Sequence, residues 1–586
     1  MNHKYLSPVE RLEDRIAPAG VVTATFANGL LTMSGTDGAD HEVNVLKIDA
    51  DTFRVVGSAT GINEADNPSK TFHGALKHVR IEGGIGADSF SLVNLSPLKS
   101  LRFSGDAGVD SFIAKKFKTM EGGRVDVDLG ADAGTVTFAG NKTLIHGYVN
   151  IDLGGGGAAS FAALTTKIDS DVTVSGGPGS DSLSTTGSVA IFRSNLRFVG
   201  AGGSDSFQAN GSSLKVKGSV HMDGGEGDNE FLFGAETMQF GTALTPRVVD
   251  LMLGTGSGEV TFVGNETTIL GNLKLDLGTG GGEAQLDSAV TNISGNVRAT
   301  GGAGDDTLEL HHLTSIGKNL SFTGGVGIDT LRATGDLLSV AGAVEIDGGS
   351  DSSAVDLDVV RLALADVRIS GGSANDTVRI SADGKISGDV IIELGLDGTG
   401  TSSTVLQSRA GHAAGLRFGG SLSIDMVGVT TDFLTVANIQ VAKSFIAQTG
   451  ENVSTVDIFN FKGKRDFKLQ TGAGADVVTV DNVDADDFFV DTQSGADELR
   501  IERNPAHLGM SQVRGTATVL TGIGADQIRI GNSSDPTNLR VAFMSAMTLN
   551  AGDGANMRND VVASNAFASA PTIISTGGTL TQTEAI

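Results

Sequence analysis

The chain lacks cysteine and tryptophan altogether, and it has only 9 proline and 2 tyrosine residues in 586. Without cysteine, disulfide staples and thiolate zinc sites are excluded. No stretch approaches the roughly 18 consecutive apolar residues of a membrane helix, so we expect no membrane insertion. Basic residues are scarce, with 42 Lys and Arg against 69 Asp and Glu, and the formal charge of −27 disfavours nucleic acid and anionic lipid as partners. Cations are the small partners that this composition favours.

Glycine is abundant instead, with 83 residues, and 39% of the chain is hydrophobic. That apolar fraction is sufficient for an extended core, so the composition argues against general disorder. The combination of many glycines with few prolines is typical of an all-β chain divided by frequent turns, and a repeat is the first feature to look for.

An apolar pair at positions i and i+2 recurs before each glycine-rich turn, as in Leu320 and Phe322 before Gly324. Most steps between the second members are 21 to 24 residues, and the larger ones are 29 to 32. These second members are Ile81, Phe103, Val127, Ile151, Val174, Phe198, Met222, Leu251, Leu275, Ala299, Phe322, Ile346, Ile369, Ile392, Ile424, Ala447, Leu469, Val490, Val519 and Leu549.

Another apolar pair follows many of the turns, and a third, less regular apolar patch comes after it. Both pairs alternate with period two, which places the apolar residues on one face of a short strand and polar residues on the other. Examples of the second pair are Phe90 and Leu92, Phe112 and Ala114, Leu308 and Leu310, and Leu331 and Ala333; examples of the third patch are Leu313 with Ile316 and Leu337 with Val340.

Three short strands and three turns in about 23 residues predict one coil of a parallel β-solenoid. We therefore expect an all-β fold, a right-handed parallel β-helix of about 20 coils of 21–24 residues, since parallel crossovers are almost always right-handed. The predicted organisation is an N-terminal segment at 1–20, a cap with the first irregular coils at 21–80, the solenoid at 81–550, and a C-terminal cap or tail at 551–586. Asn28-Gly29 predicts a hairpin within the N-terminal cap. The long coil at 394–416 is expected to bulge from the wall.

The glycine-rich turns carry an acidic residue at a fixed place, in the frame Gly-Gly-x-Gly-x-Asp-x-apolar. Full matches begin at Gly83, Gly176, Gly301 and Gly324. This frame resembles the nonapeptide of haemolysin-type (RTX-like) calcium-binding repeats, in which turn carbonyls and Asp carboxylates hold Ca²⁺. By this resemblance the metal-facing positions are Asp88, Asp181, Asp306 and Asp329, followed by the partial matches Asp110, Asp205, Asp376, Asp476, Asp497 and Asp526. Asp40, Asn229 and Asn556 occupy further partial matches.

The frame departs from that family because it occurs once per coil and not in tandem about every nine residues. A purely structural role competes with calcium, since Gly supplies unusual backbone angles and Asp or Asn closes a tight turn through its own side chain. Several coils, such as "GTGSGEVTF", keep the glycine and lose the acid. This favours turn formation as the constant requirement, with calcium at a subset of turns.

The N-terminus "MNHKYLSPVERLEDRIAPAG" has no continuous apolar region of the kind that a secretory signal peptide requires. Arg11 to Ala19 instead resemble the short Leu-Glu-x-Arg segment of large planctomycete and verrucomicrobial surface proteins. The resemblance implies an extracellular or cell-surface location. A charged leader without any targeting role is the alternative.

Other chemistry is sparse. His311-His312 has no metal-binding frame around it and is interpreted as a polar corner. The adjacent acids Asp305-Asp306 and Asp486-Asp487 are interpreted as turn residues, although paired carboxylates also serve glycan-cleaving enzymes. No Gly-x-Ser-x-Gly elbow or phosphate loop is present in a suitable context.

The sequence thus predicts a non-enzymatic structural or adhesive bacterial solenoid at the cell surface, with calcium as a cofactor at some turns and a surface glycan or surface protein as partner. Two alternatives stay open. One is a β-helix enzyme of the polysaccharide-lyase kind acting on an anionic glycan, for which Lys, Arg and carboxylates should converge in a groove. The other is a protein-interaction scaffold that uses the long-coil insertions.

Overall fold

A computed structural model describes residues 20–35, 38–95, 98–395, 400–409, 415–426, 430–502, 509–531, 539–550 and 552, and the short segments 558–561, 566–567, 572–574 and 581–582. The chain divides into two compact units, Met1–Gly203 and Ser204–Ile586. Within the described residues both units are all-β, with no helix, and their parallel stacked coils form a β-solenoid. The predicted fold class is confirmed, while the right-handed winding stays a prediction. No helix among the described residues is long and apolar enough to cross a membrane.

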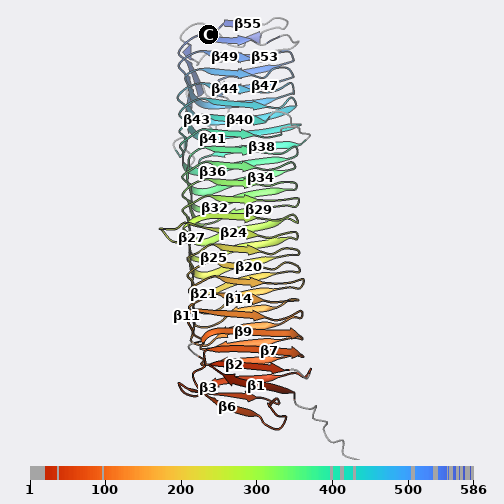
Figure 1. Cartoon of the computed structure of the whole chain (residues 1–586). Coiled ribbons are helices and arrows are strands. Elements are labelled where there is room, and N and C mark those ends of the chain that lie inside the picture. The colour runs from red at the N-terminus through yellow and green to blue at the C-terminus, as the bar shows by residue number, and fades with distance from the viewer. Residues whose placement is uncertain are drawn as a thin grey trace, which may run out of the picture. The chain divides into compact units, whose positions relative to one another are not determined.

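In the first unit, two series of strands stack coil upon coil (Figure 1). The sheet A strands are β1 (Val21–Ala27), β2 (Leu30–Gly35), β5 (Gly61–Ile62), β7 (His78–Ile85), β9 (Leu98–Ala107), β11 (Thr119–Asp128), β14 (Val149–Asp152), β17 (Val172–Ser175) and β20 (Leu196–Val199). The sheet B strands are β3 (Glu42–Lys47), β4 (Thr52–Gly57), β6 (Ser69–His73), β8 (Ser89–Val93), β10 (Ser111–Lys115), β12 (Thr135–Ala139), β13 (Lys142–Ile145), β15 (Ala158–Phe161), β16 (Thr165–Ile168), β18 (Ser182–Thr185) and β19 (Val189–Phe192).

The second unit repeats this arrangement. Its sheet A strands are β22 (Val220–Asp223), β24 (Arg247–Met252), β26 (Gly271–Asp276), β28 (Val297–Thr300), β31 (Leu320–Thr323), β33 (Val344–Asp347), β35 (Val367–Ser370), β37 (Val390–Glu393), β40 (Leu422–Met426), β42 (Phe445–Thr449), β44 (Phe467–Gln470), β46 (Phe488–Asp491), β49 (Ala517–Leu520), β52 (Met547–Asn550) and β55 (Thr572–Ile574).

The sheet B strands of the second unit are often long, because two faces of a coil join into one strand. They are β21 (Ser206–Val216), β23 (Glu230–Phe240), β25 (Gly258–Ile269), β27 (Gly282–Ile293), β29 (Thr307–Leu310), β30 (Leu313–Ile316), β32 (Asp329–Val340), β34 (Ser353–Leu364), β36 (Asp376–Ile386), β38 (Thr401–Gln407), β39 (Leu416–Phe418), β41 (Thr431–Val441), β43 (Val453–Gly463), β45 (Val477–Ala485), β47 (Glu498–Ile501), β48 (Gly509–Val513), β50 (Gln527–Ile530), β51 (Leu539–Phe543), β53 (Arg558–Val561), β54 (Ala566–Phe567) and β56 (Thr581–Gln582).

The residues of the apolar repeat form the core of each unit. Every second member of the pair before a turn, from Ile81 to Phe198 and from Met222 to Leu549, is buried in sheet A. The pairs after the turns are buried as well, among them Phe90 with Leu92 and Leu308 with Leu310. In the third patch Ile316 and Val340 are buried, but Leu313 and Leu337 lie half-buried on the other face. The prediction of a buried position was therefore correct for only one residue of each pair.

In-register pairing puts like residues next to each other in the core. Phe138 pairs with Phe161 and stacks on it at 5.3 Å between ring centroids, and Phe233 stacks on Phe262 at 4.5 Å. Within each unit, rings in adjacent coils thus stack on one another, which packs the narrow interior without Trp.

The expected hairpin at Asn28-Gly29 is present: β1 pairs antiparallel with β2, and both turn residues have positive φ, 52° and 82°. The strands β3, β4 and β6 form an antiparallel meander beside it. Of the long coil at 394–416, strand β38 and the start of β39 lie in the wall, and residues 396–399 and 410–414 fall outside the described residues. The N-terminal segment, most of the C-terminal tail and Asn556 also fall outside them.

Candidate functional site

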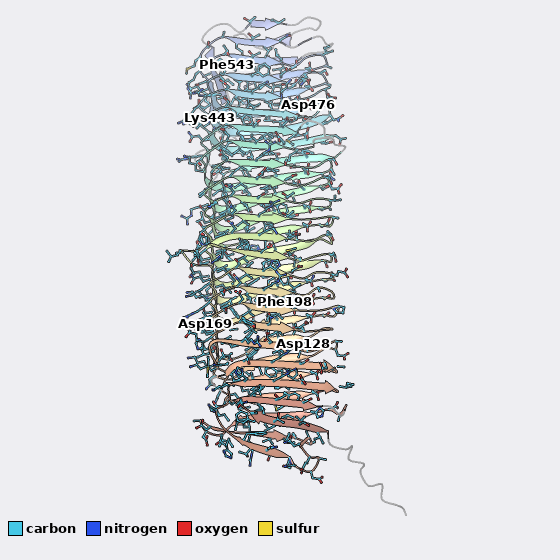
Figure 2. The ribbon with its side chains drawn as sticks, viewed as in Figure 1. Asp128, Asp169, Phe198, Lys443, Asp476 and Phe543 are labelled. Atoms are coloured by element: carbon cyan, nitrogen blue, oxygen red, sulfur yellow. The ribbon has the colours of Figure 1, made fainter. Side chains whose placement is uncertain are left out.

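The acidic residues of the glycine-rich turns form a buried column at one corner of the coils, which we call the aspartate ladder. Its carboxyl side chains are 98% or more buried at all ten predicted positions. The positions are Asp88, Asp110 and Asp181 in the first unit, and Asp205, Asp306, Asp329, Asp376, Asp476, Asp497 and Asp526 in the second. Asp476 is labelled in Figure 2, at the edge of the stack where sheet A strands end in turns.

Hydrogen bonds join one coil to the next along the ladder. The backbone N–H of Asp306 donates to Oδ1 of Asp329 at 2.9 Å, and the N–H of Asp476 donates to Oδ1 of Asp497 at 2.9 Å. In the first unit the N–H of Asp88 donates to Oδ1 of Asp110 at 2.9 Å. Each of these carboxyls satisfies a backbone donor of the preceding coil that the turn would otherwise leave unpaired.

Space for the carboxyl comes from a glycine five residues earlier in the chain. A Cβ on Gly301 would lie 2.1 Å from Oδ2 of Asp306, and a Cβ on Gly324 would lie 2.2 Å from Oδ2 of Asp329. Neither glycine needs positive φ, so the requirement is close approach and not backbone freedom.

In the later coils Thr takes the place of this glycine. Thr471, Thr492 and Thr521 stand five residues before Asp476, Asp497 and Asp526. Burial raises the pKa of Asp497 to about 6, against the lowering effect of the Asp476 N–H and the Thr492 hydroxyl. Glycine therefore offers room for the carboxyl, whereas threonine places a buried hydroxyl beside it that makes no hydrogen bond among the described residues.

Ladder residues are of two kinds, which differ in whether the second carboxyl oxygen accepts a hydrogen bond. In Asp306, Oδ1 accepts the N–H of Gly282 and Oδ2 accepts the N–H of Gly302, each at 2.8 Å. In Asp110 and Asp329, Oδ2 is buried and has no hydrogen-bond partner among the described residues. Burial raises the pKa of Asp110 to about 7 and that of Asp329 to about 6. Residues of this second kind are neutral acids over much of the acidic range.

Calcium requires six to eight oxygen ligands at about 2.4 Å. The ladder offers at most one carboxyl per coil, and Oδ1 is already bound to a backbone N–H in the contacts described above. Among the described residues no group of three or more His, Asp or Glu is arranged to hold a metal ion. The arrangement of the ladder suits closure of the turns and does not provide a calcium coordination shell. Calcium binding therefore stays a prediction, and it would require the turns to rearrange.

One partial match of the sequence lies elsewhere. Asp40 is exposed, and its carboxylate accepts the N–H of Ala87 at 2.8 Å. The ladder position in that coil belongs to His41, which is buried and bonded to Asp88 through Nδ1 at 2.7 Å. This exchange could not be predicted from the sequence, because His41 is simply the residue after the acid.

The structure also brings in acids that the glycine frame did not indicate. Asp432 pairs in register with Ser402 and Ser454 of the neighbouring coils and is 1% exposed; burial raises its pKa to about 7. No Gly-Gly-x-Gly precedes it, and only its place two residues before the buried Leu434 could have indicated it.

A second polar column, which we call the asparagine ladder, lies at another corner of the second unit. The amide of Asn460 donates to Asn438 at 2.7 Å, and that of Asn482 donates to Asn460 at 2.6 Å. The N–H of Asn482 then donates to Glu502 at 2.6 Å. All four residues have φ between 51° and 58°, which Asn tolerates better than most residues. Their spacing of 22, 22 and 20 residues is the signal that the sequence offered.

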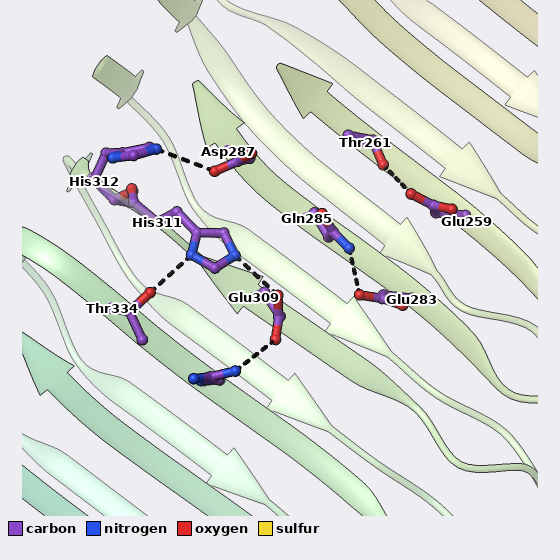
Figure 3. A network of polar contacts seen from close by, with 11 residues as sticks. Glu259, Thr261, Glu283, Gln285, Asp287, Glu309, His311, His312 and Thr334 are labelled. Atoms are coloured by element: carbon purple, nitrogen blue, oxygen red, sulfur yellow. Dashed lines mark hydrogen bonds and ion pairs between the residues drawn. The ribbon is translucent and has the colours of Figure 1, made fainter. Parts of the chain in front are cut away.

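The remaining candidates of the sequence have structural roles. His311 contacts Thr334 at 2.8 Å and Glu309 at 2.9 Å, and His312 lies 3.2 Å from Asp287, all on the outer wall (Figure 3). Beside Asp306 in the ladder, Asp305 accepts the N–H of Ile328 at 2.7 Å. Asp487 likewise accepts the N–H of Thr516. These contacts support the interpretation as turn and corner residues.

No protein-family model matches the chain, and a search of curated proteins found no similar sequence.

Proposed function

We propose that the chain is a non-enzymatic structural or adhesive solenoid of a bacterial cell surface. The observation that carries this proposal is the wall itself: coil pairs with coil in register, and the corners are closed by buried ladders. On the outer face polar side chains pair with their neighbours, as Glu259 does with Thr261 and Glu283 with Gln285 (Figure 3). Such a wall presents a regular surface at fixed spacing and suits a load-bearing or binding scaffold.

The test of location uses the full chain with a C-terminal epitope tag, expressed in a planctomycete host. We expect protease added to intact cells to remove the tag, and an Arg11→Ala, Arg15→Ala variant to retain it inside. Protection of the tag in both proteins would overturn the surface proposal. Loss of the tag in both would place the chain outside by a route that does not use this segment.

The enzyme alternative has one observation in its favour, a polar hollow in the first unit in which Lys, Arg, His and carboxylates meet, described below. Incubation of the purified chain with polygalacturonate or alginate tests it. We expect no new reducing ends and no ultraviolet absorbance from unsaturated sugar ends. Product that disappears in a His146→Gln variant would assign glycan cleavage to this site.

Calcium is proposed only as an accessory ligand of the turns. The support is the resemblance of the glycine frame together with the buried unpartnered oxygens of the ladder. Thermal unfolding in excess EDTA and in millimolar Ca²⁺ tests it. A rise in the unfolding temperature with Ca²⁺ that is lost in Asp306→Ala, Asp329→Ala would support binding, and superimposable curves would leave a calcium-free solenoid.

A further inference from the structure

A column of charged side chains follows one corner of the first unit, where strands of sheet B end. His146, Asp169 and Arg193 come directly after β13, β16 and β19. The N–H of Asp169 donates to the carbonyl of Ile145 and the N–H of Arg193 to that of Ile168, each at 2.8 Å, so the residues occupy the same place in successive coils. Asp169 lies at the edge of the stack opposite Asp128, the last residue of β11, in Figure 2.

Asp169 is shared by three basic groups. Its carboxylate lies 2.6 Å from Nδ1 of His146, 3.5 Å from Nε of Arg193 and 3.6 Å from Nζ of Lys167. Burial opposes ionisation, but these neighbours hold the pKa of Asp169 below its usual range. One negative charge faces two permanent positive charges and an imidazole, so this corner has an excess of positive charge in a chain of net charge −27.

Hydrogen bonds hold both the backbone and the ring of His146. Its backbone N–H donates to the hydroxyl of the buried Thr119 at 2.8 Å, and its backbone carbonyl accepts the N–H of Gly122 at 3.3 Å. With Nδ1 bonded to Asp169, Nε2 has no partner among the described residues. The ring is therefore oriented before any ligand arrives.

This column forms one side of a hollow of about 610 Å³, which we call the His146 hollow. Lys118, Thr119, Met120 and Glu121 form its other side. This side of the hollow is irregular, because the register between β9 and β11 shifts between Thr119 and Arg124. The shift inserts extra residues of β11 at the corner. Irregularities of this kind re-aim side chains beside a regular sheet.

Four side-chain nitrogens border the hollow without a partner among the described residues. They are Nζ of Lys118, the two terminal guanidinium nitrogens of Arg193, which touches Asp169 only through Nε, and Nε2 of His146, which is a donor when the ring is protonated. Among the described residues that line the hollow, Glu121 is the carboxylate without a basic side chain in contact, whereas Asp169 has three. A fork of guanidinium nitrogens with a fixed imidazole and an ammonium matches the oxygens of a carboxylate or sulfate.

A similar column in the second unit differs in the contacts of its arginine. Lys464, Asp486 and Arg514 follow β43, β45 and β48, again one per coil. There Arg514 binds Asp486 at 2.9 Å through one terminal nitrogen and contacts Asp484 through the other. Its guanidinium is therefore satisfied within the wall, whereas that of Arg193 is not.

We propose that the His146 hollow binds an oxyanion, the carboxylate or sulfate group of an acidic glycan. Arg193 takes two oxygens of the anion and Lys118 donates to another. Nε2 of His146 donates to the anion when its ring is protonated, because the hydrogen on Nδ1 is already bonded to Asp169. Glu121 accepts a sugar hydroxyl beside the charged group, which selects a glycan over a bare ion. The inference rests on the proposed adhesive role and gives it a ligand class.

Calorimetric titration of the full chain tests the proposal, with polygalacturonate as the carboxylate probe, dextran sulfate as the sulfate probe and dextran as the uncharged control. We expect binding of at least one acidic polymer and none of dextran. Arg193→Gln should weaken binding about tenfold or more, since a charge-assisted bidentate contact is lost. Arg514→Gln is the matched control and should leave the affinity unchanged.

Lys118→Gln is the second variant, because the side chain of Lys118 has no partner in the described part of the chain whose loss would disturb the fold. It should weaken binding several-fold with an unchanged circular dichroism spectrum. Equal affinity in wild type and Arg193→Gln, or equal losses in Arg193→Gln and Arg514→Gln, would overturn the site. Binding with an intracellular location would overturn only the surface role, and surface exposure without binding would overturn only the hollow.

Discussion

Asn229 stands in the aspartate ladder one coil after Asp205 and accepts its backbone N–H through Oδ1 at 2.7 Å. The side-chain amide of Asn229 then donates to the carbonyl of Leu253 in the next coil at 2.7 Å. A carboxyl in this position can make both contacts only when its second oxygen carries a proton. Asn229 thus always makes the two hydrogen bonds that an aspartate in the ladder can make only when it is protonated.

Asp110→Asn should stabilise the protein at pH 8. A Cβ on Gly105 would meet Oδ2 of Asp110 at 2.1 Å and the carbonyl of Leu129 at 2.9 Å, so these two oxygens border the same spot. An amide there donates to Leu129 as Asn229 donates to Leu253, and it removes a carboxyl whose ionisation is opposed by burial. We expect a gain of about 1–3 kcal/mol in the free energy of unfolding, measured in urea by circular dichroism.

Asp306→Asn is the matched control for that substitution. Both oxygens of Asp306 accept N–H groups, from Gly282 and Gly302. An amide nitrogen in place of either oxygen would face a donor, so this variant should lose about 1–2 kcal/mol. If both variants shift stability in the same direction, the distinction between the two kinds of ladder residue is wrong.

The stability of the wild-type protein should fall as the pH rises from 5 to 8. Burial raises the folded pKa of five acids to about 6 or 7, above that of the unfolded chain. Groups of this kind contribute stability that is complete below the unfolded pKa and is lost as the pH passes the folded pKa. The acids are Asp110, Asp329, Asp432, Asp497 and Glu502.

Urea midpoints at a series of pH values and constant high salt measure this effect, because salt screens the general repulsion of an acidic chain. The Asp110→Asn variant should show a shallower decline than the wild type. A midpoint that is constant or rises over this range would show that the ladder is ionised in the folded state, with a cation or an unfolded-state effect compensating it.

The fold could be predicted from the sequence, because the stacking of coils sets the spacing of the apolar residues. Leu320 and Phe322, for example, alternate with polar residues and can be buried together only on the inner face of their strand. The sequence was also sufficient for most ladder positions, since the glycine before Asp306 leaves a visible frame. It could not give His41, which replaces an acid through contacts that only the folded corner creates. Nor could it give the His146 hollow, because three charged residues about 23 apart resemble ordinary surface residues until stacking brings them together.

Gly324→Ala should destabilise the protein through the carboxyl of Asp329 and not through backbone strain. The added Cβ would lie 2.2 Å from Oδ2 and 2.5 Å from Cβ of Asp329, so the side chain has to move and its hydrogen bond from Asp306 is lost. We expect a loss of about 1–3 kcal/mol. In Gly324→Ala, Asp329→Gly the clash with the whole side chain, Cβ included, is absent, so the double variant should be more stable than the sum of the single losses predicts. Additive losses would place the cost of the alanine in the backbone.

Asn460→Ala should cost more than Asn460→Gly. Both substitutions remove the amide that donates to Asn438 and the oxygen that accepts from Asn482. The backbone of Asn460 has φ of 52°, which glycine adopts freely and alanine adopts at a cost of about 1 kcal/mol or more. Urea unfolding of the two variants measures this difference, with Ser423→Ala and Ser423→Gly on the half-buried face of β40 as the control pair. There alanine should be the more stable variant, because glycine weakens a strand interior. The same order at Asn460 would mean that the asparagine ladder relaxes out of its left-handed conformation once the amide chain is broken.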